Sequence, residues 1–227
     1  MLTGVALARR LADKLAVGAA VPTGDGFQPL FDGANTAAWS MANIKNQPGR
    51  DNPGSFLVVD GALESLPGTD IGLFWCKTPT PPNFALKLEF LRWQQDANSG
   101  VFLRFPNPET KNYNNAAYVA VEFGFEVQID ELGAPDGAAI HKTGAIYNEV
   151  GQTLSQQPAR PTGQWNELEI RVLGQDYTVF LNGQQVTVFT NAQAGRGQPS
   201  VPGLPSFIGL QTHTGRVAFR NIRIKGL

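Results

Sequence analysis

Short extended runs separated by turn-forming residues dominate the sequence from Phe27 to the C-terminus. Asn182-Gly183 lies between two alternating runs, which is the strongest short-range signal for a two-residue hairpin turn. Asp60-Gly61 indicates a similar turn, and we find no helical periodicity along this stretch. Because such a succession of strands favours two stacked antiparallel sheets, the pattern predicts an all-β sandwich. A sandwich of this length commonly forms one domain, so we expect a single domain over residues 27–227.

The first 26 residues follow a different pattern. Leu7, Leu11 and Leu15 are four residues apart, which predicts a short amphipathic N-terminal helix that serves as a docking helix or a linker. Charges at Arg9 and Arg10 interrupt the apolar run that an export signal needs, so we expect no clear signal peptide. No stretch approaches the roughly 18 apolar residues needed to cross a bilayer, which predicts no membrane span.

Charge and cysteine content exclude several classes of function. The chain carries 18 Lys and Arg against 19 Asp and Glu, and this balance offers no electrostatic footprint for nucleic acid. Cys76 is the single cysteine, which excludes an internal disulfide framework and a multi-cysteine metal site. No phosphate loop, dinucleotide fingerprint or nucleophile elbow occurs. ATP-dependent and serine-hydrolase activities are therefore not expected.

The stretch "FGFEVQIDEL" alternates polar and apolar residues, as a strand with two different faces does. It predicts Glu126, Gln128 and Asp130 on one face and Val127 and Ile129 on the other. Residues four apart on a strand are separated by about 13 Å. Standard glycosidases hold their two carboxylates about 5–5.5 Å or 6.5–9.5 Å apart. The row therefore does not predict a two-carboxylate glycosidase, unless a bulge brings Glu131 into place.

The neighbouring stretch "WQQDANSGVFLRF" adds further polar groups. Trp93, Gln95, Asn98 and Arg104 lie in or before an expected adjacent strand. Amides and a guanidinium suit sugar hydroxyls, and an aromatic ring suits the C–H face of a sugar. The alternative is a sheet face that is polar only because it meets solvent, as antiparallel sheets commonly have.

Two histidines remain as candidate acids or bases. His213 follows Gln211 by two residues, so both side chains are expected on one side of a late strand. His141 lies in the loop segment "GAAIHKTGAIY" and is the weaker candidate. Two histidines without a spaced carboxylate do not make a metal signature.

Five ordered blocks carry a resemblance to a known family. They are "FQPLFDGANTAAW", "LKLEFLRWQQDANSGVFLR", "FEVQIDE" followed by "TGAIY", "GQWNELEIRVLGQDYTVFLNGQQV" and "FIGLQTHTGRVAFRNIRIKGL". Together they resemble the 3-keto-disaccharide hydrolase family from about Phe27 to Leu227. The resemblance implies a concanavalin A-like jelly roll of two curved antiparallel sheets, with a ligand cleft on the concave face. It also implies a substrate whose C3 hydroxyl has been oxidised to a ketone.

The resemblance also implies roles for individual residues. A C3 ketone acidifies the C2 proton, so a single base can start cleavage, and Glu126 is the expected base. His213 and Arg104 are the other expected catalytic residues, with Arg104, Gln128 or a bound divalent cation stabilising the developing negative charge. The expected substrate-binding residues are Trp93, Asn98, Gln128, Asp130, Tyr147 and Gln211.

Three functions stay open at this point. The first is an enzyme that cleaves 3-keto-glycosides, the second is a non-catalytic carbohydrate-binding module of the same fold, and the third is a laminin-G-like adhesion domain that uses calcium. The first requires a fused domain or an oxidoreductase partner to supply the ketone. By resemblance, the expected location is periplasmic or secreted.

Overall fold

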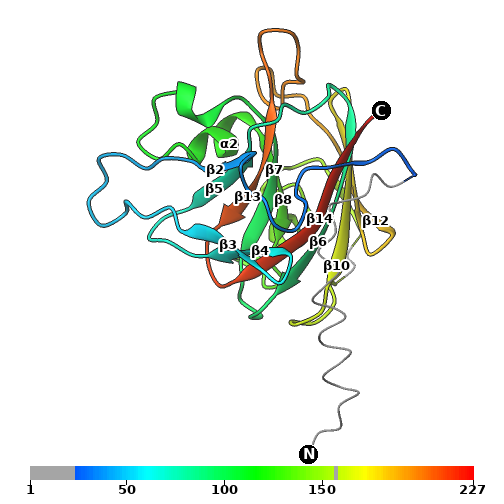
Figure 1. The fold of residues 1–227 in the computed structure, drawn as a ribbon. Helices are drawn as coiled ribbons and strands as arrows, with labels where there is room; N and C mark the ends of the chain where they lie inside the picture. The colour runs from blue at the N-terminus through cyan, green and yellow to red at the C-terminus, as the bar shows by residue number, and fades with distance from the viewer. Residues whose placement is uncertain (1–23, 156–157) are drawn as a thin grey trace, which may run out of the picture.

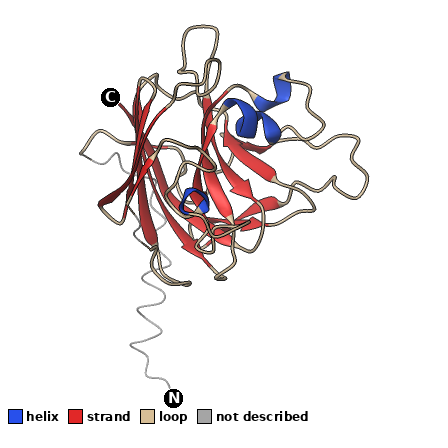
Figure 2. Cartoon of the chain, turned by 180° about the vertical axis from the view of Figure 1, so that it is seen from behind, coloured by secondary structure: helices blue, strands red, loops and turns tan. Residues whose placement is uncertain are grey.

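The structure is a computed structural model that describes residues 24–155 and 158–227. Within these residues the strands form two antiparallel sheets that stack face to face (Figures 1 and 2). The predicted all-β sandwich is confirmed. The predicted N-terminal helix falls almost wholly in residues 1–23, which lie outside the described residues.

The larger sheet has nine strands among the described residues, and the smaller has five. In spatial order the larger sheet contains β3 (Ser55–Val59), β4 (Ala62–Leu66), β14 (Val217–Gly226), β6 (Phe84–Arg92), β10 (Asn166–Leu173), β11 (Asp176–Leu181), β12 (Gln184–Thr190) and β9 (Thr153–Leu154), and β1 (Gln28–Pro29) pairs with β14. The smaller sheet contains β2 (Trp39–Met41), β5 (Gly72–Cys76), β13 (Phe207–Thr212), β7 (Ser99–Phe105) and β8 (Phe125–Ile129).

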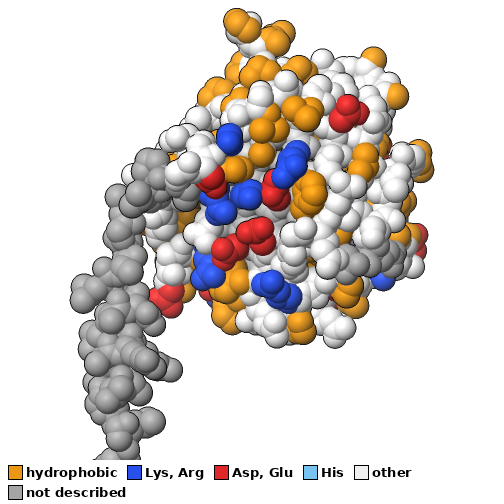
Figure 3. Space-filling view, turned by 90° about the vertical axis from the view of Figure 1, so that its right-hand side faces the viewer, with side chains coloured by type: hydrophobic (Ala, Val, Ile, Leu, Met, Phe, Trp, Pro, Cys, Tyr) orange, Lys and Arg blue, Asp and Glu red, His pale blue; other side chains and the backbone are white. Residues whose placement is uncertain are grey.

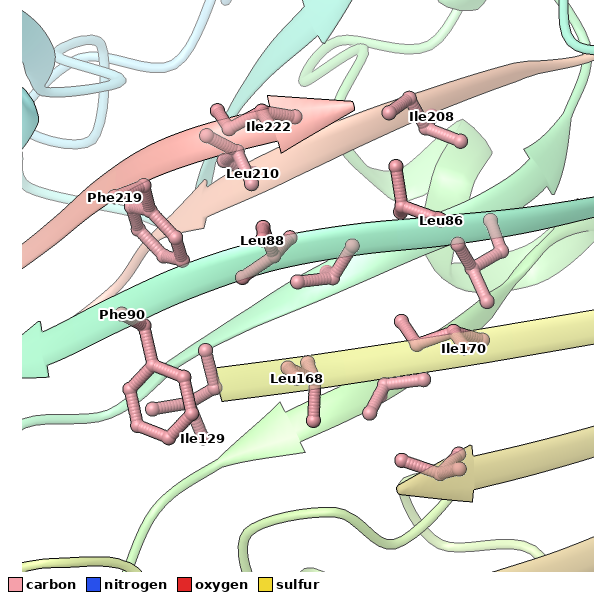
Figure 4. Close-up of a cluster of buried hydrophobic side chains, with 14 of the residues drawn as sticks. Leu86, Leu88, Phe90, Ile129, Leu168, Ile170, Ile208, Leu210, Phe219 and Ile222 are labelled. Carbon is pink, nitrogen blue, oxygen red and sulfur yellow. The ribbon is translucent and has the colours of Figure 1, made fainter. Parts of the chain in front are cut away.

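The hydrophobic core fills the space between the two sheets. Alternate residues of each strand point inward, as their period of two requires. Leu86, Leu88, Leu168 and Ile170 from the larger sheet meet Ile208, Leu210 and Ile129 from the smaller one (Figure 4). All seven side chains are buried. The alternation seen in the sequence therefore separates a core face from an outer face on each sheet.

Both predicted hairpin turns are present. Asn182 and Gly183 have φ values of 51° and 81°, and Asp60 and Gly61 have values of 47° and 80°. Positive φ at both central residues is the requirement of a type I′ turn, which matches the twist of the flanking strands. These turns fix the registers of β11 with β12 and of β3 with β4.

A short helix interrupts the expected loop between β7 and β8. The expectation that no helix follows Phe27 is wrong for α2 (Tyr118–Phe123), and the 3₁₀ turns η1 (Pro108–Thr110) and η2 (Ala139–His141) also occur. Six residues are too few for a helical period to show in the sequence. The helix packs through Ala120 on the outer face of the smaller sheet, where Phe102 and Phe105 lie.

The outer face of the larger sheet is a charged surface. Acidic and basic side chains are interspersed on it (Figure 3). Glu169 pairs with Lys87 at 3.1 Å and with Arg171 at 2.6 Å, and Glu89 pairs with Arg220 at 2.7 Å. Such partly exposed pairs contribute little stability. Among the residues described, no helix is long and apolar enough to span a membrane.

Candidate functional site

The polar row predicted from the sequence lies on the outer face of the smaller sheet. Val127 and Ile129 point into the core, whereas Glu126 and Gln128 point away from it. Both polar side chains are nevertheless buried, with exposed fractions of 8% for Glu126 and 2% for Gln128. A solvated sheet face would expose them, so burial argues against the plain solvent-face interpretation.

Gly100 makes room for the carboxyl group of Glu126. Gly100 lies on β7 and pairs with Gln128, and Glu126 pairs with Phe102. A Cβ atom placed on Gly100 would lie 2.6 Å from Cγ and 2.7 Å from Cδ of Glu126, and would overlap its Oε1. Gly100 is not among the site residues predicted from the sequence. A glycine inside a strand often marks a close approach, and this signal could have found it.

The carboxyl group of Glu126 is buried without a compensating partner. Its Oε1 atom has no hydrogen-bond partner among the described residues. Burial raises the pKa of Glu126 well above its usual range, because the charged form loses hydration and gains no nearby cation in exchange. A carboxylate with raised proton affinity is suited to accept a proton from carbon or to bind a donor from a ligand.

Two glutamines flank Gly100 on its neighbouring strands. The Oε1 atom of Gln128 accepts a hydrogen bond from the amide of Ile129 at 3.2 Å, which leaves its NH₂ group as a donor. Gln211 directly follows Leu210, which pairs with Val101, so Gln211 lies opposite Gly100.

Gln211 presents a second unpartnered acceptor. Its Oε1 atom is buried and has no hydrogen-bond partner among the described residues, as is also true of Glu126. Ser99 donates to the carbonyl oxygen of Gln211 at 2.7 Å, which holds its backbone in place. Buried polar atoms normally have partners, so two unpartnered buried acceptors on one face mark it as an unusual polar site.

Asp130 organises the loop after β8. Its Oδ1 accepts from the amides of Leu132 at 2.8 Å and Gly133 at 3.0 Å. Its Oδ2 accepts from the amide of Ala134 at 3.0 Å and from Nδ2 of Asn98 at 3.1 Å. Each carboxylate oxygen is therefore used twice. This arrangement gives Asp130 an orienting role and ties Asn98 to the end of the row.

Arg104 lies apart from the row. Its φ of 53° takes the backbone out of the regular strand conformation, so its side chain does not follow the strand alternation. The guanidinium group donates to the carbonyl oxygens of Pro82, Gly174 and Gly197. Glu126 is not among its hydrogen-bond partners, and this cation has no resolved effect on the Glu126 pKa. The structure therefore does not bring Arg104 together with the expected base.

Tyr147 and His213 lie beside the row. The amide of Tyr147 donates to the carbonyl oxygen of Glu126 at 2.8 Å. Burial and the negative charges of Glu126 and Asp130 raise the pKa of the Tyr147 hydroxyl. His213 follows β13, and its side chain is exposed. The protein atoms around its ring displace water and so lower its pKa, whereas the negative charges of Asp70 and Asp130 act to raise it.

Three other residues considered in the sequence lie outside this group. Trp93 follows β6 of the larger sheet, is 47% exposed and has the guanidinium of Arg216 5.9 Å from its ring. His141 is buried, with its Nδ1 2.8 Å from Asp136. Glu131 lines a different cavity, so no bulge brings it beside Glu126. Within the described ranges, no three His, Cys, Asp or Glu side chains are grouped so as to hold a metal ion.

The two stacked antiparallel sheets define a jelly-roll sandwich, and solved structures share this fold. One putative glycosyl hydrolase from Parabacteroides distasonis ATCC 8503 has a TM-score of 0.69 and 20% identity, over 91% of this chain and 98% of that chain. Another from the same organism has a TM-score of 0.56 and 28% identity, over 83% and 99%. The carbohydrate binding module CBM66 from Bacillus subtilis has a TM-score of 0.53 and 11% identity, over 83% and 96%.

Residues 26–225 match the family model described as the 3-keto-alpha-glucoside-1,2-lyase-like domain. The chain therefore belongs to this family, and the resemblance found in the sequence is confirmed. No functionally curated protein matches the chain.

Proposed function

We propose that the protein cleaves 3-keto-glycosides and that Glu126 is the base that starts the reaction. The observation that carries this proposal is the buried carboxyl group of Glu126, which lies over Gly100 with one oxygen unpartnered. A standard glycosidase needs a second carboxylate close by. Asp130 is engaged by four donors, so the row offers one free carboxyl group, which is what an elimination requires.

The reaction proceeds in two steps. In the first, Glu126 removes the C2 proton, the C2–H electron pair forms a C1–C2 double bond, and the C1–O bond breaks so that the aglycone leaves with its electron pair and is then protonated. In the second, water adds across the double bond, with OH at C1 and H at C2. The sum is hydrolysis of the glycosidic bond with the C3 ketone retained.

The neighbours of Glu126 have roles that their geometry suits. The NH₂ group of Gln128 donates to the C3 oxygen as negative charge develops there, which lowers the barrier to proton removal. Asn98 and Gln211 bind hydroxyl groups of the sugar. The lowered pKa of His213 favours a neutral ring near pH 7, which suits it to take a proton from the incoming water.

The substrate and its source follow from this chemistry. Without the C3 ketone the C2 proton is not acidic enough for a carboxylate, so the unoxidised glycoside should not react. An oxidoreductase that converts the C3 hydroxyl to a ketone must therefore act before this protein. The sugar ring is the part that binds to the polar row, and the aglycone is the part that departs.

The test is to incubate the protein with a 3-keto-glucoside and with its unoxidised parent. We expect aglycone release from the keto sugar alone, and loss of at least 100-fold in kcat with Glu126→Gln, as removal of a general base typically causes. Glu131→Gln is the matched control, because Glu131 is a nearby carboxylate outside the row. Equal turnover by wild type and Glu126→Gln would contradict the proposal.

The second candidate is a carbohydrate-binding module without catalysis. It is favoured by the carboxyl and amide side chains gathered around Gly100, because such groups bind hydroxyl groups without any reaction. The same experiment separates the two candidates. A module would bind both sugars and release aglycone from neither.

A further inference from the structure

We propose a second ligand site, for a small amphipathic carboxylate, in a cavity at the far end of β7 from Asn98. The cavity has a volume of about 590 Å³. It lies between the segment that follows β7 and the loop that joins β12 to β13, which stands at the top of the view in orange (Figure 1). Its volume falls within the range of small-molecule sites, about 300–1,000 Å³.

Arg104 gives the cavity lining a positive charge that no acidic residue of the lining compensates. Arg104 contributes to the lining and is 1% exposed, and its hydrogen bonds go to backbone carbonyl oxygens. Its Nε has no hydrogen-bond partner among the described residues. No Asp or Glu occurs among the residues that line the cavity. Since a buried cation without a counter-ion is costly, an anionic group is the complementary ligand.

A second cation lies in the same lining. Lys111 has its Nζ 4.8 Å from the centre of the Phe123 ring, and both residues line the cavity. The ammonium group on this aromatic face can meet a carboxylate as it enters. Two cations and no acid on one cavity surface favour a ligand with a negative charge.

The walls of the cavity require an apolar body on that ligand. Besides Phe123, the lining includes Pro106, Pro199, Pro205, Val201 and Leu204. Val201 is 47% exposed and Leu204 is 72% exposed, so apolar surface stands open to solvent beside the cavity. Binding of an aromatic or aliphatic ring would remove this surface from water. A free sugar carries no negative charge and offers little apolar surface, so the ligand differs in class from the one proposed for the Glu126 face.

The experiment uses a pair of probes on the full chain. Cinnamate carries an aromatic body and a carboxylate, and cinnamamide is its neutral counterpart of the same shape. Isothermal titration calorimetry is expected to show saturable binding of cinnamate, with the amide at least tenfold weaker because it lacks a charge-assisted hydrogen bond. Equal affinities, or no binding of either probe at millimolar concentration, would overturn the proposal.

Variants locate the site. Lys111→Gln and Leu204→Ser should each weaken cinnamate binding several-fold, whereas Val150→Ser, at a residue 82% exposed and outside the cavity lining, should leave it unchanged. Arg104→Met should abolish binding. If that variant does not fold, the probe pair and the two surface variants still decide the result. Loss of cinnamate binding in Glu126→Gln would place the ligand at the polar row that contains Glu126 and would overturn the proposal.

Discussion

The carboxyl group of Glu126 lies directly against the α-carbon of Gly100 on the neighbouring strand. The absence of a side chain at Gly100 allows the carboxyl group to come close to the sheet and to be buried there. Two amide side chains, Gln128 and Gln211, stand on either side of this position. The proposed chemistry depends on this arrangement of Glu126 between two amide side chains.

Gly100→Ala tests whether the close approach of the Glu126 side chain to Gly100 is needed. The added methyl group would force Glu126 off the sheet, so we expect the free energy of unfolding to fall by about 1–3 kcal/mol, as overpacking does. We also expect kcat/KM for a 3-keto-glucoside to fall at least tenfold. Chemical denaturation and steady-state kinetics measure these effects. Gly24→Ala is the control, because a Cβ there meets nothing within 4 Å, and an equally small effect at both glycines would refute the interpretation.

Glu126→Gln tests the raised pKa through stability. Because burial raises the pKa of Glu126 above its unfolded value of about 4.3, the protonated form is favoured in the folded state. Its stabilising contribution is complete below the unfolded pKa and is lost as pH rises through the folded pKa. We therefore expect the wild type to lose stability relative to Glu126→Gln as pH increases from 4 to 8. Urea unfolding at a series of pH values checks this, and a difference independent of pH would contradict it.

Asp130→Asn tests the support of the row. The asparagine side chain has one acceptor oxygen where Asp130 has two. Its NH₂ group would therefore face another donor, either a backbone N–H of the 132–134 loop or the NH₂ group of Asn98. We expect thermal unfolding to show a loss of about 1–3 kcal/mol, the usual cost of buried groups left unsatisfied. Exposed Asp51 provides the control in Asp51→Asn. If both variants were equally stable, the orienting role would be lost.

Arg104→Lys tests the position of the guanidinium group. A lysine lacks the planar guanidinium group and cannot donate to three carbonyl oxygens from separate segments. We therefore expect the free energy of unfolding to fall by about 2 kcal/mol or more. The KM for the keto sugar should not change, because the side chain lies apart from the row. The control is Arg171→Lys on the charged outer face, expected to stay within about 0.5 kcal/mol. A raised KM with unchanged stability would contradict this and would indicate that Arg104 contacts the sugar.

Much of the fold could be predicted because alternation and turn residues are local signals. The hairpin at Asn182-Gly183 and the outward side chains of β8 are examples. β5 was not predicted, because its five residues are all buried. Leu73 and Trp75 pack under the region of α2, while Phe74 and Cys76 face the core. A strand covered on both faces shows no alternation, so period alone does not reveal it.

The sequence by itself determined that the chain forms an antiparallel sandwich with Glu126 and Gln128 on one face, because side-chain direction in a strand follows from a period of two. Only the tertiary structure decided that Glu126 lies over Gly100, that Gln211 lies opposite Gly100, and that Arg104 turns away at a positive φ. Those relations depend on strand order and register between segments distant in the chain, and on one backbone angle. Local patterns carry no information on either.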